Sequence, residues 1–182
     1  MNPIDELKKL SDPFADFAQL FQHVEHVPGA LTPEPYREML VHDHHMTVTM
    51  ESYHGAPVTV DVLNHHLDES RDVYSRMILL RNSESEEVVQ FGIVRFDFQF
   101  VTRPVRQEIL AGQIPLGRVL INHNVLRHID LGAIVRIQAG PVVADAFQVA
   151  AGSETYGRLA TIFCNRSPAV DLLEISRPLS KT

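Results

Sequence analysis

The stretch Val94–Phe100 reads VRFDFQF, in which apolar and polar side chains alternate strictly. Its apolar residues, three of them phenylalanine, therefore share one face, and its charged and amide side chains share the other. This period of two is typical of an antiparallel strand with one face toward the core and one toward water. Together with the apolar residues before it, the pattern predicts a long strand from Val88 to about Val101.

Strand patterns recur on both sides of this segment. The sequence predicts further strands at 46–53, 57–63, 73–80, 125–138, 156–165 and 169–176. His54-Gly55 marks a hairpin turn between the first two, and 140–152 has the least regular pattern. Because the connections between strands are short, we expect one α+β domain with a mainly antiparallel sheet and helices on one side.

The first thirty residues show helical spacing instead. An apolar stripe runs through 4–10, and a second follows the capping signal Ser11-Asp12-Pro13, covers 14–24 and ends at Pro28-Gly29. We therefore expect an N-terminal helical extension over 1–30 and the main domain over 31–182. Within the main domain, short helices are expected from Thr32, at 102–110 and at 115–121.

Composition excludes several function classes. The chain has 182 residues, of which 45% are hydrophobic and 21% charged, as expected for a globular domain. Sixteen Lys and Arg against twenty-three Asp and Glu give a formal charge of −7, which argues against a nucleic-acid binder. The single cysteine, Cys164, the absence of a long apolar run and the lack of a signal-like N-terminus predict a cytoplasmic protein that does not enter a membrane.

Two charged residues lie within apolar strands. Arg76 is inside VYSRMILL (73–80), and Glu174 is inside VDLLEI (170–175). Buried Arg and Glu are rare unless they are paired. They could pair with each other in the core, or Arg76 could bind a ligand carboxylate while Glu174 acts in acid–base chemistry. The pattern alone leaves both alternatives open.

Ten histidines are present, and His42, His44 and His45 lie close together. A His-x-His pair can chelate a metal. However, these histidines fall at an expected helix end, and no Cys-x-x-Cys or His-Glu-x-x-His motif accompanies them. We therefore expect no metal site.

Several short motifs together resemble the chorismate lyase family. IPLGRVL (114–120) is similar to a Pro-Leu-Gly-Arg stretch of that family, and RMILL (76–80) to the strand that carries its substrate-binding arginine. His45-Met46-Thr47 is similar to its Ser-Met-Thr. Gly157-Arg158 and then LLE (172–174) follow the order of its C-terminal strands and their glutamate. The resemblance extends from about Thr32 to Pro178.

The resemblance implies a six-stranded antiparallel sheet and a chorismate pyruvate-lyase that forms 4-hydroxybenzoate and pyruvate, a carbon–oxygen lyase without metal or organic cofactor. Carried over to this sequence, it implies Arg76 and Glu174 as catalytic residues. The same resemblance implies substrate-binding roles for Met46, Leu116, Gly117 and Arg158. The expected partner is a small aromatic carboxylate, chorismate or 4-hydroxybenzoate, and neither a nucleic acid nor a membrane.

Two alternatives stand beside the lyase. The first is a non-catalytic module of the same fold that binds a small aromatic acid. The fold also resembles the effector-sensing domain of some bacterial transcription regulators. That domain usually follows a helix-turn-helix DNA-binding domain, for which we expect this sequence to lack both the length and the positive charge. The second is a lyase acting on a related enol ether. The sequence leaves the oligomeric state open.

Overall fold

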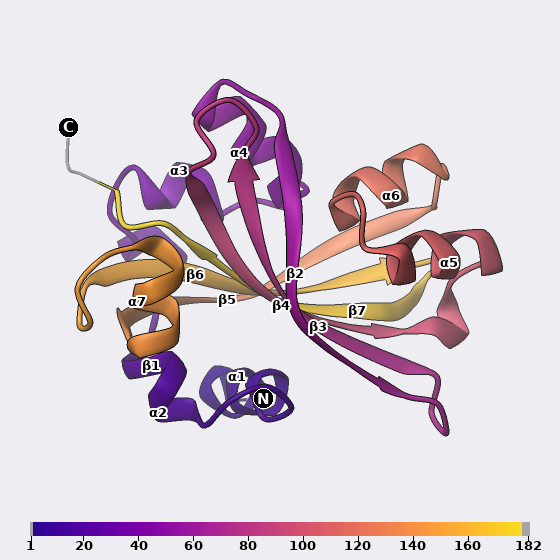
Figure 1. Cartoon of the computed structure of the whole chain (residues 1–182), viewed down its shortest axis with the longest axis horizontal. Coiled ribbons are helices and arrows are strands. Elements are labelled where there is room, and N and C mark those ends of the chain that lie inside the picture. The colour runs from indigo at the N-terminus through magenta and orange to yellow at the C-terminus, as the bar shows by residue number, and fades with distance from the viewer. Residues whose placement is uncertain (1, 180–182) are drawn as a thin grey trace.

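One continuous sheet of seven antiparallel strands organises the computed structural model, which describes residues 2–179 (Figure 1). The strands are β1 (Phe21–Val27), β2 (Val58–Asp68), β3 (Val73–Asn82), β4 (Val88–Asp97), β5 (Arg127–Ala139), β6 (Glu154–Cys164) and β7 (Ser167–Ser176). Their order across the sheet is β1-β5-β6-β7-β4-β3-β2. Residues 1 and 180–182, at the ends of the two expected segments, lie outside the described residues.

Helices cover both faces of the sheet. They are α1 (Pro3–Ser11), α2 (Phe17–Leu20), α3 (Tyr36–Leu40), α4 (Met46–His54), α5 (Arg103–Ala111), α6 (Leu116–Asn122) and α7 (Pro141–Phe147), with 3₁₀ turns η1 (Gly29–Leu31) and η2 (Phe98–Phe100). One apolar cluster joins α1, α2 and α7 to the sheet. On the opposite face one cluster includes α5 and α6, and another includes α3 and α4 (Figure 1).

The α+β class and the antiparallel sheet are confirmed, with two differences. The sheet has seven strands instead of six because Phe21–Val27 forms a strand at its edge and pairs with β5. The expected helix that continues to Val24 is therefore wrong, since α2 ends at Leu20. Helices also lie on both faces, where the sequence indicated one.

The largest local correction concerns Met46–Tyr53, which forms helix α4 instead of a strand. The segment MTVTM alternates and contains β-branched residues, which explains the strand prediction. In the structure Met46 and Met50, four residues apart, are both buried, as on one face of a helix. Gly55 ends the helix with φ of 71°, a left-handed conformation that glycine adopts without steric cost.

Two further segments differ from expectation. The strand that begins at Val88 ends at Asp97, whose side chain accepts a hydrogen bond from Gln99 N and caps the turn η2. The stretch at 140–152, expected to be irregular, contains helix α7, which begins with Pro141 in its first turn. None of the helices in residues 2–179 combines the length and apolar character needed to span a bilayer.

Candidate functional site

A small enclosed space, called the central cavity below, lies between the sheet and helices α4 and α6. Its floor is formed by side chains of β2, β3, β4, β5, β6 and β7, and its roof by the N-terminal ends of the two helices. It is lined by His45, Met46, Thr47, Val60, Arg76, Ile78, Leu80, Gln90, Val94, Pro115, Leu116, Gly117, Ile129, Arg158, Ile162, Leu172 and Glu174. All six residues named from the family resemblance therefore line one cavity.

Arg76 is a buried cation without an anionic partner. Its residue is 1% exposed, and its guanidinium carbon lies 5.3 Å from the centre of the Phe96 ring. Arg76 Nη1 donates to the Ile109 carbonyl at 3.3 Å, whereas Nε is buried without any partner. Within residues 2–179 no acidic side chain pairs with Arg76, and burial lowers its pKa. Its guanidinium therefore retains unused hydrogen-bonding capacity at the cavity.

Glu174 pairs with Arg158 and not with Arg76, so the ion pair between Arg76 and Glu174 considered from the sequence is wrong. Arg158 and Glu174 lie opposite each other on β6 and β7. Arg158 Nε donates to Glu174 Oε2 at 2.7 Å, and both residues are buried. The sequence offered no means of preferring Arg158, because strand register decides which residues face each other.

Arg158 also connects the sheet to the loop between α3 and α4. Its Nη1 donates to the His42 carbonyl at 3.1 Å, and its Nη2 donates to the His44 carbonyl at 3.0 Å. Nη1 also lies 3.2 Å from His42 Nδ1. Because the His42 Nε2 lies 2.7 Å from the Met39 carbonyl, Nε2 carries the proton and Nδ1 accepts. One buried guanidinium thus holds the loop that leads into the roof helix α4.

His45, next to this loop, is held neutral. Burial, followed by the charges of Arg127 and Arg158, lowers its pKa to about 4. Its Nε2 therefore accepts a hydrogen bond from Arg127 Nε at 2.6 Å. Burial and the charge of Arg158 lower the pKa of His42 as well. In the part of the chain that the structure describes, no three His, Cys, Asp or Glu side chains are placed to share a metal ion.

The roof is tightly packed where α4 and α6 meet. Gly117 has no side chain, and a Cβ there would lie 2.8 Å from Thr47 Oγ1 and 3.1 Å from His45 Cβ. Glycine at this position therefore allows the two helix ends to approach each other above the floor. Met46 and Thr47, in the first turn of α4, line the cavity, so the unpaired N–H groups and positive dipole end of that helix favour an anion there.

Sequence reasoning missed one polar residue of the cavity, Gln90. It is 3% exposed, and its Oε1 is buried without a hydrogen-bond partner. The signal that identified Arg76 was present here too, because Gln90 is the one polar residue in VVQFGIV (88–94).

The central cavity is narrow, with a volume of about 30 Å³. This is the space of roughly one water molecule. An organic acid therefore enters only when the roof moves away from the sheet.

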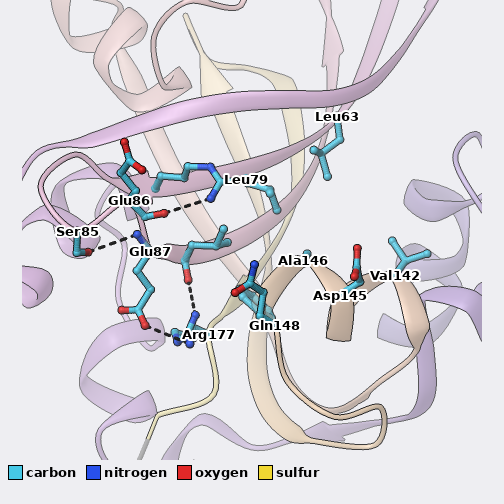
Figure 2. Close-up of a pocket in the computed structure, with 13 residues that line it drawn as sticks. Leu63, Leu79, Ser85, Glu86, Glu87, Val142, Asp145, Ala146, Gln148 and Arg177 are labelled. Atoms are coloured by element: carbon cyan, nitrogen blue, oxygen red, sulfur yellow. Dashed lines mark hydrogen bonds and ion pairs between the residues drawn. The ribbon is translucent and has the colours of Figure 1, made fainter.

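A wider hollow, of about 670 Å³, lies on the other face between the β3–β4 turn and α7 (Figure 2). Its two arginines are already engaged: Arg177 pairs with Glu87 at 3.1 Å and also donates to the Val88 carbonyl at 3.2 Å. Arg81 Nη1 donates to the Glu86 carbonyl at 3.1 Å. This hollow is open and its cations are satisfied, so the central cavity is the stronger candidate site.

No protein-family model and no curated protein matches the sequence. The fold, however, is similar to solved structures. The effector domain of PhnF from Mycobacterium smegmatis matches with a TM-score of 0.52 and 11% identity, over 74% of this chain and 88% of that domain. The longer PhnF structure matches with a TM-score of 0.51 and 11% identity, over 73% of this chain and 63% of its own.

A third structure is the ligand-binding domain of a putative GntR-family transcriptional regulator from Bordetella bronchiseptica. It matches with a TM-score of 0.51 and 10% identity, over 69% of this chain and 92% of that domain.

These findings correct the expected function. The two matching domains are described as an effector domain and a ligand-binding domain, which overturns the expectation of a chorismate pyruvate-lyase producing 4-hydroxybenzoate and pyruvate. The geometry gives a physical reason as well, because the carboxylate expected to act as a catalytic acid–base group is committed to Arg158. The resemblance to chorismate lyases holds for the fold alone, and the chain shares its fold with the effector domain of PhnF and with the ligand-binding domain of the putative GntR-family regulator.

Proposed function

We propose that the domain senses a small carboxylate with an apolar body, bound in the central cavity with its carboxylate on Arg76. The observation that carries the proposal is the state of Arg76: 1% exposed, without an acidic partner in residues 2–179, and with Nε unpaired. A buried charge without a counter-ion is costly, and a bound anion removes that cost. A carboxylate is the natural partner because it accepts two parallel hydrogen bonds from a guanidinium.

The charges around the cavity favour a ligand with one negative charge. Its ionisable lining residues are His45, which is neutral because its pKa is about 4, together with Arg76, Arg158 and Glu174. Two cations and one anion leave a net charge of +1. A single carboxylate balances this charge, whereas a dianion leaves one charge unmatched in a buried site.

The rest of the lining favours an apolar body. Between the polar groups the cavity is bounded by aliphatic side chains, namely Val60, Ile78, Leu80, Val94, Leu116, Ile129, Ile162 and Leu172. Such surfaces gain free energy by excluding water from apolar ligand atoms. An aromatic carboxylate, the partner inferred from the sequence, has this combination of a charged end and an apolar ring.

A cavity this small suits a sensor. Because about 30 Å³ cannot hold an organic acid, binding must be linked to movement of α4, α6 or the His42–His45 loop. A domain that must open in order to bind converts ligand concentration into a change of shape. The descriptions of the similar structures as effector and ligand-binding domains of regulators support this role.

Calorimetry with a panel of monocarboxylates and their uncharged amides tests the proposal. Benzoate, phenylacetate and hexanoate can be compared with benzamide, phenylacetamide and hexanamide. We expect at least one acid to bind wild type, its amide not to bind, and Arg76→Met to abolish binding without lowering the melting temperature. Arg95→Met is the matched control, because Arg95 is a half-exposed strand arginine paired with Asp171. Binding that survives Arg76→Met, or the absence of binding by every acid, overturns the proposal.

A further inference from the structure

Gln90 is the second polar group of the central cavity with unused hydrogen-bonding capacity. In the strand register it lies between Leu80 of β3 and Ser176 of β7. Leu80 has no polar side-chain atom, and the Ser176 hydroxyl donates to the Arg177 carbonyl at 2.9 Å. Gln90 Oε1 is therefore buried without a partner in residues 2–179. Leaving a buried polar atom unpaired is destabilising, so an amide at this position calls for an explanation.

Gln90 and Arg76 lie at separate points of the same sheet face. Arg76 is opposite Val94 of β4, and Gln90 precedes Val94 by four residues on that strand. An even separation keeps both side chains on the cavity face and places them about 13 Å apart along the strand direction. Gly92, midway between them, contributes no side chain, and Ile78 lies opposite it on β3. The cavity thus has a cation toward one end, an amide toward the other and an apolar floor between them.

From this arrangement we infer that Gln90 is a specificity-determining residue that hydrogen-bonds a hydroxyl group of the ligand. The inference rests on the proposed carboxylate site at Arg76. The ligand class is then a hydroxy acid whose hydroxyl lies at the end opposite its carboxylate. A hydroxyl group both donates and accepts, so it pairs with either end of the Gln90 amide. An acid without the hydroxyl leaves the amide unpaired and binds more weakly.

Matched ligands separate this contact from the carboxylate contact. The probes are the straight-chain acids from butanoate to octanoate with their ω-hydroxy counterparts, and phenylacetate with para-hydroxyphenylacetate. Their affinities are measured by calorimetry for wild type, Gln90→Met and Arg76→Met. Gln90→Leu is a second variant in case Gln90→Met does not fold, and Gln138→Met, at an exposed glutamine of β5, is the matched control.

We expect a hydroxy acid of suitable length to bind wild type about tenfold more tightly than its parent acid. Gln90→Met should remove that advantage, so that the hydroxy acid and its parent acid bind with similar affinities. Without ligand, Gln90→Met should melt about 2–6 °C above wild type, because it removes an unpaired buried group. A purely structural glutamine would instead lose stability on substitution and leave the ratio of the two affinities unchanged.

Failure of the inference and failure of the proposed function give different results. The carboxylate site stands if acids bind wild type and Arg76→Met abolishes their binding. The inference about Gln90 is nevertheless overturned if no hydroxy acid binds more tightly than its parent acid, or if Gln90→Met retains that difference in affinity. If neither member of any pair binds wild type, or if binding survives Arg76→Met, the proposed function fails, and the inference fails with it.

Discussion

Arg158 and Glu174 face each other across β6 and β7, with Arg158 Nε 2.7 Å from Glu174 Oε2. In this buried pair each side chain balances the charge of the other. The pair also prevents Glu174 from neutralising Arg76, which lies two strands away on β3. The register between β6 and β7 thus pairs Glu174 with Arg158, and Arg76 has no acidic partner in residues 2–179.

Replacing Glu174 by Gln should destabilise the protein. The amide leaves the charge of Arg158 uncompensated in the interior, and breaking a buried pair in this way costs about 3–5 kcal/mol. Urea denaturation measures the loss of unfolding free energy. Glu25→Gln removes one member of an exposed pair with Arg136 and should cost less than about 1 kcal/mol. Equal stability of Glu174→Gln and wild type would contradict this account of the pair.

Arg76→Lys should weaken binding of a carboxylate ligand while the protein remains folded. Lysine keeps the positive charge but loses the planar fork that makes two parallel hydrogen bonds, which corresponds to roughly a 10–100-fold loss of affinity. Calorimetry with the tightest acid of the panel provides the measurement, and Arg95→Lys is its control. Affinity within twofold of wild type would show that Arg76 acts only as a point charge.

Stability should fall as the pH drops below 6.5. The pKa of His45 is lowered to about 4 in the folded state, and burial lowers the pKa of His42 as well. Between pH 6.5 and about 4 the unfolded chain therefore binds more protons than the folded chain, which favours unfolding. Melting temperatures across this range should show the decline.

His45→Gln tests the source of that decline. Glutamine retains an oxygen that can accept from Arg127 but takes up no proton, so the variant should lose less stability between pH 6.5 and 4. His44→Gln is the matched control because the His44 side chain is exposed. Parallel curves for His45→Gln and wild type would assign the acid sensitivity to other groups.

Gly117→Ala should disturb the roof of the central cavity. The added methyl group would lie 2.8 Å from Thr47 Oγ1, so α4 or α6 must shift. Overpacking of this kind costs about 1–3 kcal/mol. Thermal denaturation should show the loss, and Gly117→Ala combined with Thr47→Ala should recover part of it. Additive losses in the double variant would mean that this contact does not limit the packing.

The sequence predicted the parts of the fold in which local pattern and burial agree. The strands around Arg76 and Glu174 are apolar on both faces, so their character was clear and the two charges stood out. The strand prediction for MTVTM (46–50) was wrong. Met46 and Met50 lie on the same side of the segment whether it is a strand or a helix, so this short pattern does not distinguish the two. Tertiary packing of Met46 and Met50 decides between the two.

The residues named from the sequence line one cavity, but the contacts between them were not predicted. Arg76, Arg158 and Glu174 line one cavity, yet their pairing depends on register between strands that are distant in sequence. The role of Arg158 in holding the His42 and His44 carbonyls is likewise invisible without coordinates. Gln90 was not predicted because its amide is uncharged and its presence in an apolar strand is less unusual than that of a charge. Its burial nevertheless indicates a polar role in the cavity as clearly as the burial of Arg76 does.

The small volume of the central cavity also has a kinetic consequence. If the acid enters only when the roof has lifted, opening precedes association, and the observed binding rate should reach a plateau as ligand concentration rises. The measured Kd then exceeds the intrinsic Kd by the reciprocal of the open fraction. The two bonds from Arg158 to the His42 and His44 carbonyls hold the loop before α4, so in the proposed function their strength would influence both the rate of opening and the measured Kd.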